Sequence, residues 1–264
     1  MLRCPVCHAD LIRQAATVRC SNGHAFDVAK EGYLNLTIGH SVKSHGDDSE
    51  MVIARRRFLS AGHYAPLKEA LLAQLAQLNP DSIVDLGCGE GDYTQAMADA
   101  GYPVIGIDLS KSAIKRAAKG SSVTYVIANL TQTPLIDQAV DVAVSIFSPF
   151  DPHEVHRISR HWFVVVRPLP HHLVELKSLL YPTVRLNPDP ALALPHMRHH
   201  HRTQVVFSME LTQPDLSDLL TMTPYVHTSP ADGIQRVTTC PQLNVTAAFA
   251  VDVFETCTED GKSI

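Results

Sequence analysis

Three glycines at alternate positions, Gly87, Gly89 and Gly91, follow an apolar run that ends in Asp85. This pattern predicts a buried parallel strand that leads into a tight turn against a ligand. Glycine is expected at all three positions because a Cβ atom there would hold the ligand away from the backbone. The spacing differs from the dinucleotide fingerprint, which needs its third glycine one residue later, where this chain has Asp92.

A second acidic residue lies at a suitable distance from this turn. Segment 103–109 predicts the next strand, with Asp108 at its end. A carboxylate about 20 residues after such a turn can accept hydrogen bonds from both hydroxyls of a ribose. Ser110 is the type of residue that caps a helix, which is predicted over 111–119. The pattern resembles motif I of the class I S-adenosylmethionine-dependent methyltransferases, whose cofactor lacks a pyrophosphate and tolerates a carboxylate such as Glu90.

Cysteine and histidine residues near the N-terminus have the spacing of a metal site. Cys4 and Cys7 form one pair, and Cys20 and His24 form a second pair after a loop of twelve residues. Three thiolates and one imidazole predict a closed tetrahedral zinc site with a structural role. His8 is an alternative fourth ligand, although it directly follows Cys7. A segment this short needs the metal for most of its folding energy.

Length and composition limit the classes of protein that are compatible with this chain. The 264 residues contain 45% hydrophobic residues, enough for a proper core. No apolar run reaches the length of about 18 residues that a membrane span needs, so no membrane association is expected. The first residues lack the apolar segment of a secretory signal. Clustered cysteines favour metal binding in a reducing compartment, and the predicted location is the cytoplasm.

Any surface that binds nucleic acid must be local, because the net charge is −5. The best candidate is the run Arg55, Arg56 and Arg57, for which a solvated helix face is the alternative. Consecutive helical residues point about 100° apart, so one of the three is expected to be buried or paired with an acid such as Glu50 or Asp48. Other basic residues close to the run or to the metal ligands are Lys43, Lys30, Arg13 and Arg19.

The segments around these motifs make the chain recognisable. It resembles the large-subunit (23S) ribosomal RNA guanine-N1-methyltransferases, which include the tylosin-resistance methyltransferases. The resemblance extends from residue 4 to about residue 225. Besides the metal ligands and the glycine turn, it rests on segments 26–36, 46–51, 54–59, 62–67, 106–115, 170–177 and 222–224.

The resemblance has consequences for ligands and partners. It implies zinc on the four N-terminal ligands, a 23S rRNA hairpin as substrate, and a homodimer. It implies cofactor contacts from Tyr64, the Glu90–Gly91 turn and His172, for which core packing and a satisfied ring are the alternatives from the residues alone. The full set of predicted cofactor-binding residues is Tyr64, Asp85, Gly87, Gly89, Glu90, Gly91, Asp108, Leu109, Asn129, Leu130 and His172.

Two departures from the family pattern stand out. Members generally carry a Pro-Gly-Gly turn before the fifth strand, where this chain has Ile-Ser-Arg-His-Trp at 158–162. This leaves the local loop, and part of the rim of the cofactor pocket, open to a different geometry. The histidine-rich run 195–202 is interpreted as an exposed, variable connection that gains charge below about pH 6.5.

The strands and helices expected around these residues indicate an α/β fold. It is predicted to consist of a Rossmann-like class I methyltransferase sheet and a small N-terminal zinc module. Residues 1–38 are the predicted zinc module with a hairpin at 11–12 and 17–18, residues 39–81 a linker and helical region, and residues 82–264 the methyltransferase domain. Alternation of strands and helices favours a parallel sheet with helices on both faces. The strands are predicted near 82–86, 103–107, 123–127, 140–146 and 162–167, with an antiparallel edge at 204–210 and 245–254 around a helix at 213–220.

The acceptor base is expected at the end of the fourth strand, because guanine N1 lies on the pairing edge and the base must be unpaired or flipped out. Ser148, Pro149 and Phe150 are the predicted pocket, with the 148–149 backbone on the base edge. Phe150 is preferred over Phe147 for stacking, and core packing is the alternative for both. Asp151 is a weak candidate for a general base, and water is the alternative.

Two other functions remain open. The sheet also suits a methyltransferase that acts on small molecules, although such a substrate does not need a zinc module. The missing Pro-Gly-Gly turn leaves room for a non-catalytic RNA-binding or assembly protein that keeps a relic cofactor site.

Overall fold

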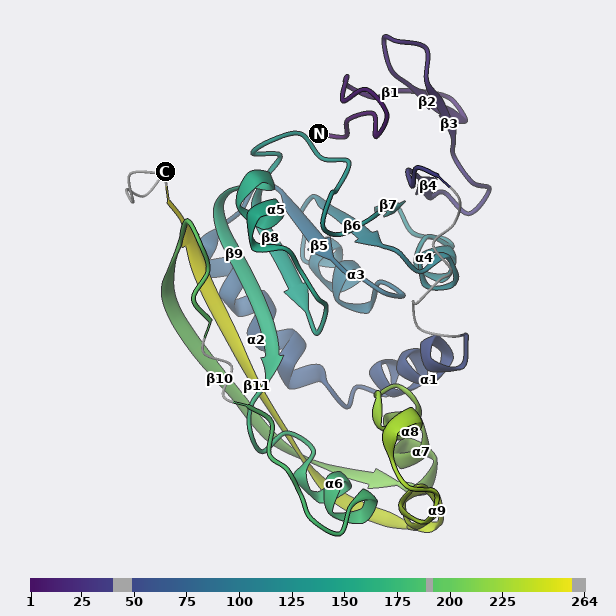
Figure 1. Ribbon diagram of the computed structural model, residues 1–264, viewed down its shortest axis with the longest axis vertical. Helices are drawn as coiled ribbons and strands as arrows, with labels where there is room; N and C mark the ends of the chain where they lie inside the picture. Colours follow the sequence, from purple (N-terminus) through teal and green to yellow (C-terminus); the bar gives the residue numbers. More distant parts are fainter. Residues whose placement is uncertain (40–48, 189–191, 258–264) are drawn as a thin grey trace.

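The computed structural model describes residues 1–39, 49–188 and 192–257 and has two sheets in this part of the chain (Figure 1). A small antiparallel sheet has the order β1-β2-β3, and a large sheet has the order β10-β11-β9-β8-β5-β6-β7-β4. The strands are β1 (Ile12–Gln14), β2 (Thr17–Arg19), β3 (Ala25–Asp27), β4 (Leu34–Asn35), β5 (Ile83–Leu86), β6 (Val104–Asp108), β7 (Thr124–Ile127), β8 (Val140–Ile146), β9 (Ser159–Pro168), β10 (Met197–Thr212) and β11 (Gln242–Thr256). The helices are α1 (Ser49–Ser60), α2 (Ala65–Leu78), α3 (Asp92–Asp99), α4 (Lys111–Ala117), α5 (Pro152–Ile158), α6 (Val174–Leu180), α7 (Gln213–Thr221), α8 (Tyr225–Thr228) and α9 (Ala231–Thr239).

The five strands predicted for the parallel sheet are present as β5 to β9, and they pair in parallel. Both faces of this sheet are buried, which explains the nearly continuous apolar sequence of its strands. In β5, Ile83 packs in the core beneath α1, α2 and α3, whereas Val84 packs in the core on the face of α5. The predicted antiparallel edge is also present, because β11 pairs with β9 and β10 pairs with β11.

The histidine-rich run is largely exposed, as predicted, but its interpretation as a connection is wrong. Residues from Met197 onward belong to β10, which pairs with β11 along its length. His199 Nε2 lies 2.9 Å from Asp252 Oδ1, and His201 Nε2 lies 2.6 Å from Gln74 Oε1. The run reads as a loop because it lacks apolar alternation, but its polar side chains have partners on neighbouring strands and on α2.

The N-terminal segment is tied to the methyltransferase part of the chain at two places, once in the large sheet and once in the segment between β7 and β8. Leu34 in β4 pairs with Val126 of β7 in parallel, so the strand lies within the predicted zinc module yet extends the large sheet. Leu2 forms a bridge with Leu135, and the Arg3 backbone N–H donates to the Pro134 carbonyl at 2.8 Å. The predicted hairpin is present as β1 and β2, and β3 is an additional third strand.

The segment in place of the Pro-Gly-Gly turn forms no separate loop. Helix α5 ends at Ile158, and Ser159 both caps it and begins β9. Ser159 pairs with Val140, the first residue of β8. The departure therefore lies at the amino end of the parallel strands, opposite to the edge that carries the glycine turn.

In the described residues, no helix has the length and apolarity needed to cross a membrane.

Candidate functional site

The four predicted metal ligands converge at the N-terminus. The ligand atoms of Cys4, Cys7, Cys20 and His24 all lie within 4.8 Å of one another. The Sγ atoms of Cys7 and Cys20 are 3.6 Å apart, and Cys20 Sγ lies 3.4 Å from His24 Nδ1. Edges of this size suit a tetrahedron around Zn²⁺, with metal–sulfur bonds of about 2.3 Å. A hydrogen bond from the Ala9 backbone lowers the pKa of the Cys7 thiol to about 6, which favours the thiolate that binds metal.

The glycine turn follows β5 as predicted, but only one of its glycines faces open space. Gly87, Gly89 and Gly91 have φ angles of +77°, +55° and +83°, a left-handed region that favours glycine. A Cβ atom on Gly87 would lie 1.9 Å from Ser148 Oγ, and one on Gly91 would lie 2.5 Å from the Tyr125 hydroxyl oxygen. At these two positions the missing Cβ makes room for protein side chains, and contact of their backbone with a ligand stays a prediction.

Gly89 retains the role expected of a ligand-facing glycine. The nearest atom to a Cβ on this residue is an Arg55 guanidinium nitrogen at 3.9 Å. The backbone N–H of Gly89 donates to Asp108 Oδ2 at 2.9 Å, which joins the turn to the end of β6. Asp108 Oδ1 accepts from the Ser110 N–H at 2.7 Å, and Ser110 is the predicted cap of α4. The Asp108 carboxylate is thus held in place at the carboxyl edge of the sheet.

Asp85 has one carboxylate oxygen without a protein partner. The Thr94 hydroxyl donates to Oδ2 at 2.6 Å, while Oδ1 is buried and has no hydrogen bond among the described residues. Burial raises the pKa of Asp85 to about 7, Thr94 opposes this increase, and the nearby Asp108 adds to it. An unpaired buried acceptor is costly, and a cationic amino group satisfies it. Together with the open face of Gly89 and the Asp108 carboxylate, it fits S-adenosylmethionine.

Tyr64 and His172 come from distant parts of the chain but lie in one aromatic cluster. Their ring centroids are 6.3 Å apart, and both pack against Phe249 of β11. The Ala248 N–H donates to His172 Nδ1 at 3.2 Å, so the proton of the neutral ring is on Nε2. Burial, followed by the nearby Lys177, lowers the pKa of His172 to about 3. Burial raises the pKa of Tyr64, which therefore keeps its proton.

Comparison with known proteins extends over both parts of the chain. A family model described as "RlmA, N-terminal", a zinc ribbon, matches residues 2–40, and a methyltransferase domain model matches residues 83–169. The chain is 34% identical over 258 residues to the 23S rRNA (guanine(748)-N(1))-methyltransferase of Streptomyces fradiae, and 92% of each protein is covered. The chain belongs to this family of 23S rRNA (guanine-N1)-methyltransferases.

Two further relatives show how far the similarity extends to an rRNA methyltransferase and to a methyltransferase with another substrate. A protein of Micromonospora griseorubida, provisionally named as a 23S rRNA (guanine-N(1)-)-methyltransferase, is 35% identical over 287 residues, with 94% of each chain covered. The malonyl-[acyl-carrier protein] O-methyltransferase of Pseudescherichia vulneris is 36% identical, but over only 78 residues, 29% of this chain and 31% of that protein. Similarity to the malonyl-[acyl-carrier protein] O-methyltransferase thus extends over less than a third of either protein.

The remaining predicted cofactor residues, Leu109, Asn129 and Leu130, lie shortly after the ends of β6 and β7. Leu109 directly follows β6 and is partly exposed. Asn129 follows β7, and its Oδ1 accepts from the backbone N–H and hydroxyl of Thr131, both at 3.0 Å. Leu130 lies 3.6 Å from the position of a Cβ on Gly87. These residues share the carboxyl edge with Asp108, where ligands bind to open α/β sheets.

At the end of β8, the structure reverses the preference between the two phenylalanines. Phe150 packs against Phe163 in the core, with ring centroids 4.8 Å apart. Phe147 is 45% exposed and has a φ angle of +57°, an unusual backbone for an aromatic residue. Its ring lies 6.5 Å from that of Tyr64. No local sequence signal marks this difference, because both residues follow the same apolar strand.

The other residues of this segment have clear structural partners. Ser148 fills the space left by Gly87, and its backbone carbonyl accepts from the Ser145 hydroxyl at 3.1 Å. Pro149 is exposed. Asp151 caps α5 by accepting from the His153 N–H at 2.8 Å, so the weak candidate for a general base acts as a helix cap.

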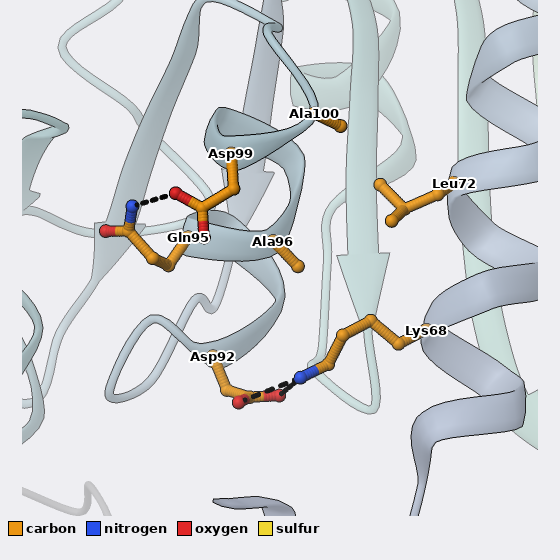
Figure 2. Close-up of a pocket in the computed structure, with 7 residues that line it drawn as sticks. All are labelled: Lys68, Leu72, Asp92, Gln95, Ala96, Asp99 and Ala100. Atoms are coloured by element: carbon orange, nitrogen blue, oxygen red, sulfur yellow. Dashed lines mark hydrogen bonds and ion pairs between the residues drawn. The ribbon is translucent and has the colours of Figure 1, made fainter. Parts of the chain in front are cut away.

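A cavity of about 500 Å³ lies between α2 and α3 rather than at the carboxyl edge (Figure 2). In it, Lys68 Nζ lies 2.9 Å from Asp92 Oδ2, and the Gln95 amide donates to Asp99 Oδ1 at 2.8 Å. None of the predicted site residues lines this cavity. Its ion pair joins α2 to the first turn of α3 and thereby holds the helix that follows the glycine turn.

Proposed function

We propose that this chain transfers a methyl group from S-adenosylmethionine to N1 of a guanine in a hairpin of 23S rRNA. The observation that carries the proposal is the similarity to a named enzyme of this specificity across both the zinc ribbon and the sheet. A substrate other than rRNA is less well supported, because similarity to the malonyl-[acyl-carrier protein] O-methyltransferase covers only 29% of the chain. The cytoplasm is the proposed location because rRNA is there, and a homodimer remains a prediction.

The cofactor, when bound, supplies an electrophilic methyl group on a sulfonium. Asp108 would hold its ribose, and the unpaired Oδ1 of Asp85 would face its cationic amino-acid end. The Gly89 backbone permits close approach, because nothing but Arg55 lies within 4 Å of the place of a side chain. A relic site would not be expected to keep a buried unpaired carboxylate oxygen, which costs stability without serving a ligand.

The residues near the acceptor are neutral hydrogen-bonding groups rather than bases. His172 has a pKa of about 3, and its Nδ1 accepts from the Ala248 backbone, so this nitrogen does not take up a proton at neutral pH. Tyr64 stays protonated because burial raises its pKa. We therefore infer that the proton of guanine N1 leaves to water, while both side chains shape and dry the pocket.

Phe147 is the residue that we assign to the acceptor base. It follows β8 at the carboxyl edge, its backbone is left-handed, and its ring is 45% exposed. The exposed ring borders the rings of Tyr64 and Phe249, with centroid distances of 6.5 and 5.2 Å. A flipped-out guanine needs a flat partner once it leaves its own helix. Strained backbone of this kind is common at binding sites.

The function is tested by transfer of a tritiated methyl group to unmodified 23S rRNA, followed by mapping of the modified nucleotide. We expect 1-methylguanosine at one hairpin position. Incorporation into no RNA, or at a position other than guanine N1, contradicts the proposed function.

The stacking role makes a separate prediction for Phe147→Ala. Loss of one base–aromatic stack costs about 1–3 kcal/mol, so kcat/KM for rRNA should fall roughly 5- to 150-fold. Affinity for S-adenosylmethionine, measured by calorimetry, should change little. Phe147→Tyr is the matched control and should retain most of the activity. If Phe147→Ala instead lowers the melting temperature and leaves kcat/KM unchanged, the ring is structural.

A further inference from the structure

A second cavity, of about 400 Å³, lies between α1, α3 and α4. Three basic residues line it: Arg56 from α1, Arg116 from the end of α4, and Lys119 from the turn after α4. In the described part of the chain, none of the three forms an ion pair or a side-chain hydrogen bond. Three cations that face one cavity without carboxylate partners repel one another, and an anion in the cavity relieves that repulsion.

The three consecutive arginines of α1 diverge, as expected for adjacent helical residues. Arg57 Nε donates to Asp218 of α7 at 2.8 Å, so the expected acidic partner is Asp218 rather than Glu50, while Asp48 lies outside the described residues. Arg55 donates to the Met222 carbonyl at 3.3 Å and approaches the glycine turn. Arg56 is the arginine of the run that lines the cavity.

A buried hydroxyl group also points to a missing ligand. Tyr125 of β7 is 1% exposed and lines the cavity, and among the described residues no acceptor lies in hydrogen-bonding geometry to its hydroxyl proton. Burial raises its pKa, so the hydroxyl remains a donor, although Ser121 and Thr94 lie close enough to oppose that increase. An unpaired buried donor costs about 1–3 kcal/mol, which an acceptor oxygen in the cavity would recover.

The three cations of the lining outnumber its two acidic residues, Glu90 and Asp92. Asp92 is engaged by Lys68 at 2.9 Å. Both carboxylate oxygens of Glu90 are shielded from solvent. The groups that remain accessible are the three cations and the hydroxyls of Ser60 and Ser122, because the Ser121 hydroxyl already donates to Gln95 Oε1 at 2.8 Å. This set of donors suits a tetrahedral anion with several acceptor oxygens.

We propose that this cavity binds a backbone phosphate of the RNA substrate. The site rests on the proposed function for the identity of its ligand. Gly91 belongs to the cofactor turn and also lines the cavity, where it packs on Tyr125. A phosphate held there fixes the RNA backbone beside the turn that binds the cofactor. It also explains how a chain with a net charge of −5 holds RNA.

The test compares the double variant Arg116→Gln/Lys119→Gln with the wild type and with Arg185→Gln, which removes an exposed positive charge elsewhere. We expect affinity for unmodified 23S rRNA to fall about tenfold or more, and the log–log salt slope to fall by about 0.7–0.9 for each lost phosphate contact. Arg185→Gln should leave both unchanged. Affinity for S-adenosylmethionine should be the same in all three proteins.

Tyr125→Phe separates ligand binding from a structural role. Removal of an unpaired buried hydroxyl should leave the melting temperature unchanged or higher, while rRNA affinity falls several-fold. A lower melting temperature with unchanged rRNA affinity would assign the hydroxyl to the fold and overturn its part in the site.

The outcomes also distinguish this site from the proposed function. Unchanged rRNA affinity and salt slope in the double variant, in a protein that methylates rRNA, overturn the phosphate site alone. A loss of S-adenosylmethionine affinity in the double variant assigns the cavity to the cofactor and overturns the proposal as well. If the wild type modifies no rRNA, calorimetry with inorganic pyrophosphate tests the site. Binding to the wild type that is lost in the double variant supports an anion site. Equal binding to both proteins, or no binding to the wild type, overturns it.

Discussion

Cys20→Ala will unfold the N-terminal ribbon and remove the zinc, while the sheet keeps its affinity for S-adenosylmethionine. The strands of the ribbon contribute little to any core, because β1 is exposed throughout and Val18 is the buried residue of β2. The metal must therefore supply most of the folding energy of this segment, and structural zinc binds with apparent free energies of about 10–16 kcal/mol. Elemental analysis, limited proteolysis of residues 1–30 and calorimetry with the cofactor measure the three effects.

Cys240→Ala is the matched control for this experiment. Cys240 is half-buried and lies outside the metal cluster, so its loss should leave the zinc content unchanged. The Cys20 variant should also lose rRNA affinity. A wild-type protein that is free of metal and still protects its first 30 residues from protease would disprove the zinc site.

Sequence alone is sufficient for the parts of this protein that depend on local spacing. The apolar run before Asp85, the spacing to Asp108 and the paired ligands from Cys4 to His24 each describe a motif within a few tens of residues. These motifs place the strand ends, the cap of α4 and the metal ligands correctly. Each depends on backbone geometry that a few residue types satisfy.

Features that depend on distant partners could not be predicted. The acid that pairs with Arg57 is Asp218, on a helix 161 residues later in the sequence. The histidine-rich run becomes strand β10 because β11 provides its pairing partners and Asp252 accepts from His199. Such contacts are set by which elements the fold brings together, and no local pattern reveals them.

The exposure of Phe147 illustrates the same limit within the site. Phe147 and Phe150 lie three positions apart after the same strand, β8, and hydrophobicity alone favours burial of both. The left-handed backbone at Phe147 directs its ring to the carboxyl edge, while Phe150 reaches Phe163 on β9. A positive φ angle on an aromatic residue has no sequence signature, so the sequence proposes both rings for stacking and only the structure distinguishes the exposed one.

Asp85→Asn should weaken S-adenosylmethionine binding strongly and stabilise the cofactor-free protein at alkaline pH. The amide keeps an acceptor for the Thr94 hydroxyl, which donates to the carboxylate at 2.6 Å. It loses the negative charge that we propose to face the cationic end of the cofactor. Breaking a buried charge pair by removing one partner costs about 3–5 kcal/mol, or more than 100-fold in affinity.

The stability effect follows from the raised pKa of Asp85, which is about 7. Between the ordinary value for a carboxyl group and about 7, the folded protein binds a proton that the unfolded chain releases, so this group stabilises the fold at low pH. That contribution is lost as the pH rises through about 7, where the buried carboxylate ionises. The variant, which does not ionise, should therefore gain melting temperature over the wild type progressively from about pH 4 to pH 7, and the difference should stay constant above about pH 8.

The pH dependence of cofactor affinity gives the sharper measurement. In the wild type, affinity should fall as the pH drops below the pKa of Asp85, because the protonated acid cannot pair with an ammonium group, and the variant should lack this dependence. Asp99→Asn, an exposed carboxylate on α3, removes the same charge and should behave like the wild type. Should Asp85→Asn bind the cofactor as tightly as the wild type at pH 8, the unpaired oxygen faces something other than the cofactor, because a buried charge in contact with a cationic ligand cannot be neutralised without loss of binding energy.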